Sequence, residues 1–369
     1  MRLSIGVMNP VARTLAVGAA IAFAAWGSPA AAVPSTELTI SGAVQTPKTM
    51  DRDDLLALPA LTQTVTFTSG GGSQTHTYTG TSLWGVLGGA VIQTDPAVRN
   101  DILRKYVIAT GTDGYKAVIA AGEISPSFGN RAYSVAYDEI IGGVSQPLGG
   151  DGFARTVLPG DVKGGRYVSN LADLEVGSAH SVVAGTGGGQ STSFSVLGGV
   201  STPGLTFDLE DLQDMTTITQ TVSFLSGSTQ QTRTYVGVSL WGLLDSVGIV
   251  ADSSIKNDIL RKYVVATGSD GYKAVFSMGE LNPGFGNQPD MIAFAEVVGG
   301  NEVLLSGDGF ARIVVPGDLR GGRYVSNLIS LEVYDATAPI PEPGTWGLMA
   351  AGLGMLVLVL RRNRSPSRH

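Results

Sequence analysis

Short stretches of alternating apolar and polar residues predict strands along most of the chain. Leu38, Ile40 and Val44 lie on one face of the first predicted strand. Residues 106–110 and 115–120 predict a later pair of strands, and Gly-Thr-Asp-Gly between them is typical of a hairpin turn. The pattern predicts a sheet whose neighbouring strands run mainly antiparallel.

Two short helices are predicted between the strands. Asp51 can cap a turn that carries Leu55, because an aspartate side chain accepts hydrogen bonds from the first backbone N–H groups of a helix. Ser82 can cap a second turn that places Leu83 and Leu87 on one face. The predicted fold class is therefore α+β, with a mainly antiparallel sheet and short helices.

The same pattern occurs twice. Residues 82–118 and 239–275 are identical at 24 of 37 positions and lie 157 residues apart. Upstream, Gly42 and Gly198 begin matching segments at an offset of 156, so one copy carries a one-residue insertion. A repeat of this length indicates a duplicated domain and not the unit of a solenoid.

The duplication sets the predicted domain boundaries. We expect one domain at residues 36–176 and a second at 193–334, each folding independently with the same topology. Residues 177–192 are rich in Gly and Ser and predict a flexible linker.

The N-terminus predicts export. Arg2 and Arg13 precede the apolar segment 15–26, and small residues follow up to Ala32. This order is typical of a signal peptide at residues 1–32, cleaved by signal peptidase after its last alanine. An uncleaved anchor helix is the alternative.

The C-terminus predicts sorting at the membrane. The motif Pro341, Glu342, Pro343 precedes an apolar segment at 344–360, and a cluster of arginines follows. Residues 340–369 thus resemble the PEP-CTERM sorting signal of Gram-negative bacteria, which implies recognition by an exosortase-type sorting enzyme. We expect an inner-membrane intermediate and then a cell-surface or extracellular-matrix location. A plain tail anchor is the alternative.

Composition excludes several kinds of chemistry. The chain has 369 residues and no cysteine, so disulfides, thiolate metal sites and cysteine nucleophiles are excluded. Residues 33–343 contain 18 basic and 31 acidic residues, a net charge of −13. Nucleic acid is not an expected partner, because phosphate backbones bind to basic surfaces.

Both repeats carry the same ordered series of motifs. Each has Gly-x-Val-x-x-Pro, then Ser-Leu-Trp-Gly, Asp-Gly-Tyr-Lys-Ala-Val and Gly-Asp-Gly-Phe-Ala-Arg. The series resembles the oxidoreductase molybdopterin-binding domain of the sulfite-oxidase type over almost all of both repeats. The resemblance implies that fold and a molybdopterin cofactor. It also implies a cysteine ligand to molybdenum, and Ser69 and Ser226 stand at that position.

Several basic residues are candidates for binding an anion. The resemblance places Arg155 and Arg312 near a pterin and an oxyanion substrate, although ion pairs with Asp151 and Asp308 are the favoured alternative. Other basic residues flank Gly-Gly turns whose backbone N–H groups could hold an anion, or which form ordinary polar hairpins. These residues are Lys163, Arg166, Arg320 and Arg323.

No catalytic or metal-binding group is predicted. The three histidines are His76, His180 and His369, and the first aligns with Arg233 in the second repeat. A general base shared by both repeats is therefore absent from the sequence.

The sequence is compatible with three functions. The first is a non-catalytic domain pair that binds a small anion, an extracellular polysaccharide or a surface protein. The second is a molybdopterin-dependent oxidoreductase without the usual cysteine ligand. The third is a structural spacer in a surface polymer. The lack of cysteine favours a non-catalytic role, and no cofactor is then expected.

Overall fold

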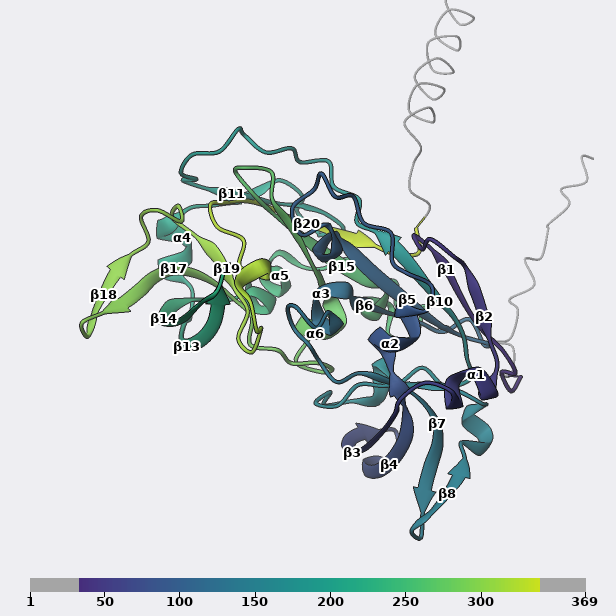
Figure 1. The fold of residues 1–369 in the computed structure, drawn as a ribbon. Coiled ribbons are helices and arrows are strands. Elements are labelled where there is room, and N and C mark those ends of the chain that lie inside the picture. Colours follow the sequence, from purple (N-terminus) through teal and green to yellow (C-terminus); the bar gives the residue numbers. More distant parts are fainter. Residues whose placement is uncertain (1–32, 339–369) are drawn as a thin grey trace, which may run out of the picture. The chain divides into compact units, whose positions relative to one another are not determined.

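A computed structural model of the protein describes residues 33–338, where each repeat forms two five-stranded sheets (Figure 1). The first sheet of repeat 1 has the order β2-β1-β10-β5-β6, and only β1 and β10 pair in parallel. Its strands are β1 (Leu38–Gly42), β2 (Lys48–Met50), β5 (Lys105–Gly111), β6 (Lys116–Ala120) and β10 (Leu171–Ser178).

The second sheet of repeat 1 is antiparallel throughout. Its order is β3-β4-β7-β8, and the short strand β9 also pairs with β7. Its strands are β3 (Ala60–Ser69), β4 (Gly72–Ser82), β7 (Ser134–Ile141), β8 (Val144–Pro147) and β9 (Arg155–Val157).

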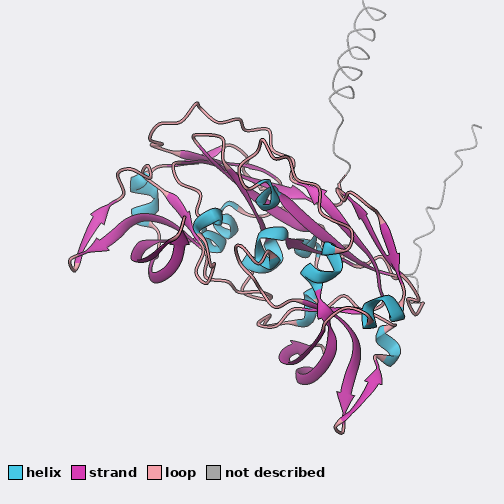
Figure 2. Ribbon diagram, viewed as in Figure 1, coloured by secondary structure: helices cyan, strands magenta, loops and turns pink. Residues whose placement is uncertain are grey.

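Repeat 2 has the same two strand orders, β12-β11-β20-β15-β16 and β13-β14-β17-β18 with β19 beside β17. The structure therefore confirms two similar, mainly antiparallel-sheet domains with short helices (Figure 2). The strands are β11 (Phe194–Gly198), β12 (Leu205–Phe207), β13 (Thr217–Ser226), β14 (Thr229–Ser239), β15 (Lys262–Gly268), β16 (Lys273–Ser277), β17 (Met291–Val298), β18 (Asn301–Leu304), β19 (Arg312–Val314) and β20 (Leu328–Asp335).

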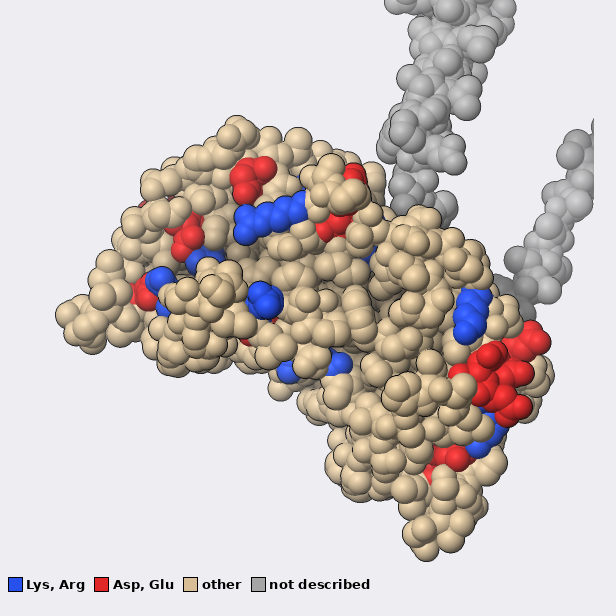
Figure 3. Space-filling view, in the orientation of Figure 1, with Lys and Arg blue, Asp and Glu red and all other residues tan. Residues whose placement is uncertain are grey.

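The predicted helix caps are present. The Asp51 carboxylate accepts from the backbone N–H of Asp54, and the Ser82 hydroxyl accepts from that of Gly85. Acidic side chains gather over α1 on the face drawn in Figure 3, which agrees with a solvated helix start. The helices are α1 (Arg52–Leu56), α2 (Leu83–Gly88), α3 (Ala121–Ile124), α4 (Leu209–Asp214), α5 (Leu240–Val247) and α6 (Met278–Leu281), and the 3-10 turns are η1 (Asp101–Arg104), η2 (Gly149–Asp151), η3 (Gly164–Arg166), η4 (Asp258–Arg261) and η5 (Gly321–Arg323).

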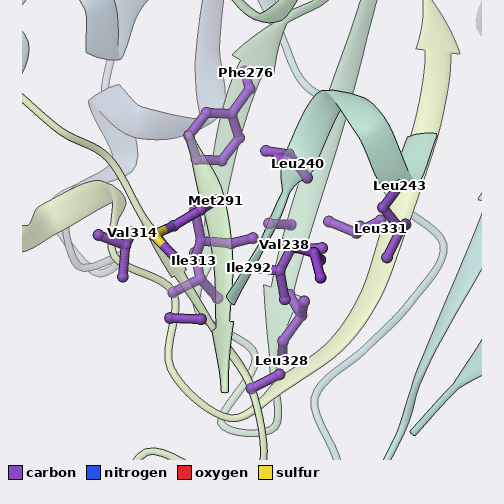
Figure 4. Close-up of a cluster of buried hydrophobic side chains, with 14 of the residues drawn as sticks. Val238, Leu240, Leu243, Phe276, Met291, Ile292, Ile313, Val314, Leu328 and Leu331 are labelled. Atoms are coloured by element: carbon purple, nitrogen blue, oxygen red, sulfur yellow. The ribbon is translucent and has the colours of Figure 1, made fainter. Parts of the chain in front are cut away.

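The hydrophobic cores of the two repeats exchange residues. Figure 4 shows part of the core of repeat 2, where Leu240 and Ile292 are fully buried. Leu103 and Phe128 of repeat 1 belong to the same buried cluster, and Leu260 of repeat 2 is buried in the core of repeat 1. Each repeat thus completes the apolar core of the other.

Equivalent residues meet across the junction of the repeats. Tyr106 and Tyr263, 157 residues apart, stack with ring centroids 4.7 Å from each other. The backbone N–H of Val162 donates to the carbonyl of Phe285 at 2.7 Å, and the equivalent bond from Leu319 to Phe128 measures 2.8 Å. Reciprocal contacts of this kind are those of an isologous dimer interface, here within one chain.

The segment between the repeats is bound to repeat 2 and is not the free linker predicted from its composition. The backbone N–H of Val182 donates to the buried carboxylate of Glu332 at 2.9 Å, and that of Thr186 donates to the Ser269 carbonyl at 2.7 Å. The segment packs because it supplies donors that satisfy a buried charge, even though its side chains are small.

Within residues 33–338 no helix is both long enough and apolar enough to cross a membrane. The predicted signal peptide and the predicted membrane segment at 344–360 lie outside the described residues.

Candidate functional site

Each repeat carries a pocket beside the turn of its long hairpin, β3–β4 or β13–β14. The first pocket, in repeat 1, has a volume of about 800 Å³, and the second pocket, in repeat 2, of about 970 Å³. Equivalent residues line the two. The first pocket includes Ser69, His76, Tyr78, Arg155, Lys163 and Tyr167, and the second includes Ser226, Arg233, Tyr235, Arg312, Arg320 and Tyr324.

Six of the eight residues proposed from sequence therefore line these pockets, three in each. They come from separate elements: a hairpin end, a short strand and the residue before a 3-10 turn. The pairing of β9 with β7 positions Arg155, and that of β19 with β17 positions Arg312. Backbone bridges from Thr68 to Lys163 and from Leu225 to Arg320 place the other two basic residues beside the hairpin ends.

Arg155 lies in the wall of the first pocket and is 7% exposed. It forms the expected ion pair with Asp151, and its Nη1 donates to the Tyr78 hydroxyl at 3.1 Å. The guanidinium also lies over the rings of Tyr78 and Tyr167, 5.1 and 5.8 Å from their centroids. Its Nε is buried without a hydrogen-bond partner within residues 33–338.

Arg312 repeats this arrangement in the second pocket. Its Nη1 pairs with Asp308 at 2.5 Å, and the guanidinium lies over the rings of Tyr235 and Tyr324 at 5.6 and 5.7 Å. The Nε atom of Arg312 is likewise buried with no partner in the described part of the chain. Both repeats therefore keep a paired arginine, buried in repeat 1 and half-buried in repeat 2, whose buried Nε has no partner among the described residues.

The tyrosines of the pocket walls stay protonated and can donate hydrogen bonds. Burial raises the pKa of Tyr78 to about 12, although the nearby Arg155 acts to lower it. Burial also raises the pKa of Tyr235. The Tyr78 oxygen accepts from Arg155, so its own O–H remains available to a ligand acceptor.

The residues present do not fit a molybdenum centre of the sulfite-oxidase type. Ser69 ends β3 and lines the first pocket, and Ser226 ends β13 and lines the second. A neutral serine hydroxyl is a hard, weak ligand, and the chain has no cysteine to supply the soft thiolate that the family uses. Within residues 33–338 no group of three or more His, Asp or Glu side chains is placed to hold a metal ion.

The sequence predicted Arg166 and Arg323 as candidates for anion binding, but both are fully buried. Arg166 donates to Asp161 at 2.6 Å and to Glu123 at 2.7 Å. All donor nitrogens of this guanidinium are engaged with groups inside the protein. The Arg323 guanidinium is held in the same way by its own pair of carboxylates, so neither arginine is free to bind an external anion.

The Gly-Gly turns serve packing between the repeats. A Cβ atom on Gly165 would lie 2.2 Å from the ring of Phe285, and one on Gly322 would lie 2.1 Å from the ring of Phe128. Glycine is needed at both turns because an aromatic ring of the other repeat occupies the space of a side chain. This contact replaces the backbone anion site that the sequence suggested.

Each pocket also contains residues of the other repeat, which sequence reasoning missed. Arg99, Asn100 and Phe128 of repeat 1 line the second pocket, and Lys256 of repeat 2 lines the first. The Asn100 amide donates to the Tyr272 hydroxyl at 2.9 Å. Their conservation between the repeats was visible in the sequence, but the reciprocal placement follows only from the pairing of the two halves.

The two pockets differ in charge. The second pocket is lined by four arginines and two aspartates. The first pocket is lined by three basic residues and three carboxylates. His76, which contacts Glu139 at 2.6 Å in the first pocket, is replaced by Arg233 in the second. Arg233 itself pairs with Glu296 at 2.8 Å. Arg99 and Arg320 of the second pocket, like Lys163 and Lys256 of the first, form no ion pair with a carboxylate within residues 33–338. The second pocket is therefore the more favourable one for an anion.

Comparisons with known proteins locate one motif. Residues 339–364 match the PEP-CTERM protein-sorting motif, which implies processing by an exosortase and an exported, cell-surface protein. Among curated proteins none has significant sequence similarity to the chain. Among solved structures, the sulfane dehydrogenase SoxCD from Paracoccus pantotrophus is similar at 13% identity and a TM-score of 0.32, over 79% of this chain and 77% of that chain. A TM-score of this size does not establish a shared fold.

Proposed function

We propose that this protein is displayed at the cell surface, where its pockets bind an organic anion without redox chemistry. The observation that carries the proposal is the arginine of each pocket wall, Arg155 or Arg312. Each lies over two aromatic rings and keeps a buried Nε donor without a partner in the described residues. An unsatisfied buried donor costs about 1–3 kcal/mol, and an anion that reached this nitrogen from the pocket would recover that cost.

The second pocket is the principal binding site in this proposal. The chain has a net charge of −13 between residues 33 and 343, so an anion is repelled unless a local cluster of cations overcomes the overall field. Arg99 and Arg320 supply such a cluster together with Arg312. Guanidinium groups suit carboxylate, sulfate and phosphate because two parallel N–H donors match two oxygens.

The size of the pocket favours an organic ligand over a bare inorganic ion. A volume of about 970 Å³ is at the upper end of small-molecule sites. Tyr235 and Tyr324 provide aromatic faces beside the arginine, which suits the apolar face of a sugar ring or an aromatic group. Acidic groups of an extracellular polysaccharide or of a surface protein are the sources that the predicted location offers.

Molybdopterin-dependent oxidation is the alternative that the sequence resemblance implies. Molybdopterin would supply oxygen-atom transfer if the pockets held it, but Ser69 and Ser226 lack the thiolate that such a site requires. No catalytic step is therefore assigned to either pocket.

Calorimetric titration of glucuronate into protein purified from its native envelope tests the proposal. The matched variants are Arg320→Ala in the second pocket and Lys163→Ala at the equivalent place in the first. We expect Arg320→Ala to weaken binding by about tenfold to a hundredfold, because a charge-assisted hydrogen bond contributes about 1.5–3 kcal/mol. Lys163→Ala should change binding to the second pocket less than twofold. Binding should also weaken as salt is raised.

Two results would contradict the proposal. Stoichiometric molybdenum and pterin in the native protein, with oxidation of sulfite, would establish the redox alternative. Failure of glucuronate, inorganic sulfate and inorganic phosphate to bind at low salt would leave the structural-spacer function.

A further inference from the structure

A third pocket adjoins the second one and is apolar. It has a volume of about 360 Å³, and we call it the annex. Ile102, Ser127 and Phe128 line both the annex and the second pocket, so the two pockets meet at these residues. The other apolar residues of the annex are Trp84, Leu87, Val91 and Ile92.

Val91 is held in the annex at a conformational cost. Its φ of 56° lies in the left-handed region, which a β-branched residue rarely adopts. The side chain is also 45% exposed, so burial in the core does not account for it. The equivalent residue in repeat 2 is Gly248, with a φ of 79°. Repeat 1 thus keeps a strained, exposed apolar side chain where glycine satisfies the backbone, and that side chain lines the annex.

The equivalent surface of repeat 2 has a different chemical character. Asp245 of α5 takes the place of Gly88, another residue that lines the annex. With Gly248 in place of Val91, repeat 2 has a carboxylate where repeat 1 has none and lacks the apolar side chain. The cationic second pocket therefore adjoins the apolar surface of repeat 1, through the residues that it shares with the annex.

We propose that the second pocket and the annex together bind one amphipathic organic anion, an inference that rests on the anion binding proposed above. The anionic group lies with Arg99 and Arg320, and an alkyl or aryl group of the same molecule occupies the annex. A dry cavity of about 150 Å³ accommodates benzene, so the annex has room for a ring or a chain of several carbons. Burial of the apolar group adds affinity that a bare anion cannot gain.

The test uses sulfonates that share one head group and differ in chain length. Methanesulfonate, butanesulfonate and hexanesulfonate are titrated by calorimetry into the intact protein purified from its envelope. We expect affinity to rise about threefold to fourfold for each methylene that enters the annex. The heat-capacity change should become more negative with chain length, because apolar surface is removed from water.

Two variants of repeat 1 locate the apolar group. Gly88→Asp introduces the residue of repeat 2, and a Cβ atom at this position meets no other atom within 4 Å. Val91→Gly removes the strained side chain and should leave the protein equally or more stable to urea. Both variants should reduce hexanesulfonate affinity toward that of methanesulfonate, while methanesulfonate binding changes little. Asp245→Gly in repeat 2 is the matched control and should not alter hexanesulfonate binding to the second pocket.

The outcomes separate this inference from the proposed function. Sulfonates that bind with equal affinity at all chain lengths would overturn the amphipathic ligand and leave anion binding intact. A chain-length gain that survives both Gly88→Asp and Val91→Gly would place the apolar group elsewhere and also overturn it. Failure of every sulfonate, methanesulfonate included, would overturn both.

Discussion

Asp290→Asn should stabilise the protein in a pH-dependent way. Asp290 is 1% exposed, and neither carboxylate oxygen has a hydrogen-bond partner within residues 33–338. It stands where repeat 1 has Tyr133, whose hydroxyl donates to Glu123 and accepts from Arg166 at 3.2 Å each. The shorter aspartate makes neither type of bond.

The surroundings of Asp290 are unfavourable to a negative charge. Burial is the main cause that raises its pKa to about 7, and the charges of Asp318 and Glu123 raise it further against the opposing effects of Arg323 and Arg131. Burial also raises the pKa of Glu280 well above its usual range. The cluster therefore holds protons near neutral pH.

The expected magnitude follows from the pKa of Asp290. A tenfold change in a protonation equilibrium corresponds to ~1.4 kcal/mol, so a rise from 3.8 to about 7 corresponds to about 4 kcal/mol. The folded-state pKa is the higher one, so the stability contributed by the protonated carboxyl is complete below pH 3.8 and is lost as pH rises through about 7. Asparagine cannot ionise and should not show this loss.

Urea unfolding at pH 4, 5.5 and 8 measures the effect. Asp290→Asn and the natural protein should differ little at pH 4, and the variant should be more stable by up to about 4 kcal/mol at pH 8. Tyr133→Phe is the control, because burial raises the pKa of Tyr133 well above 10 and it does not titrate in this range. The control should be less stable by about 1–3 kcal/mol at every pH. An equal effect of Asp290→Asn at pH 4 and pH 8 would refute the reasoning.

Three further predictions concern folding and processing. Residues 36–176 alone should not form a cooperatively folded monomer, because Leu103 and Phe128 would no longer be buried in the core of repeat 2. A monomer in sedimentation that unfolds cooperatively in urea would contradict this prediction. Gly165→Ala should destabilise the protein by about 1–3 kcal/mol or more, because its Cβ would lie 2.2 Å from the ring of Phe285. An unchanged midpoint of urea unfolding would be inconsistent with this packing. In a host with an exosortase, the mature chain should begin near Val33 and lack residues 344–360. If mass spectrometry of the native protein still finds this segment, the tail is a plain membrane anchor.

The elements set by local chemistry were predictable from sequence. Asp51 and Ser82 cap helices as expected, because a cap needs only one side chain and the next few backbone N–H groups. The turn between β5 and β6 forms where Gly-Thr-Asp-Gly stands, with Gly114 at a φ of 80°. The ion pairs of Arg155 and Arg312 were also predictable, because each partner lies only four residues away in the sequence.

The long-range features were not predictable. Arg166 follows a Gly-Gly pair in a segment that resembles an exposed polar turn, yet it is buried against Glu123, 43 residues away. The Gly/Ser-rich segment was predicted to be flexible because its side chains are small. Its composition does not reveal that its backbone N–H groups donate to the buried carboxylate of Glu332. Independent folding of the repeats was inferred from their constant offset. The offset indicates a common origin, but it does not show that Leu103 of repeat 1 is buried in the core of repeat 2.

Joining two copies in one chain removes a constraint that a symmetric dimer cannot escape. In a homodimer any substitution appears in both sites, so a residue that favours a ligand in one pocket is imposed on the other. Here the reciprocal contacts at the junction are retained, as in the hydrogen bonds from Asn100 and Asn257 to a tyrosine of the other repeat. The sites around them have diverged, with Arg233 in place of His76 and Asp245 in place of Gly88. The junction has also diverged in places, since Ser277 donates to Glu123 across it while the equivalent residue of repeat 1 is Ala120. Divergence that makes one pocket more cationic than the other, while the reciprocal asparagine–tyrosine bonds persist, is what selection for two different binding surfaces would produce, and a pure spacer would have no reason to keep that distinction.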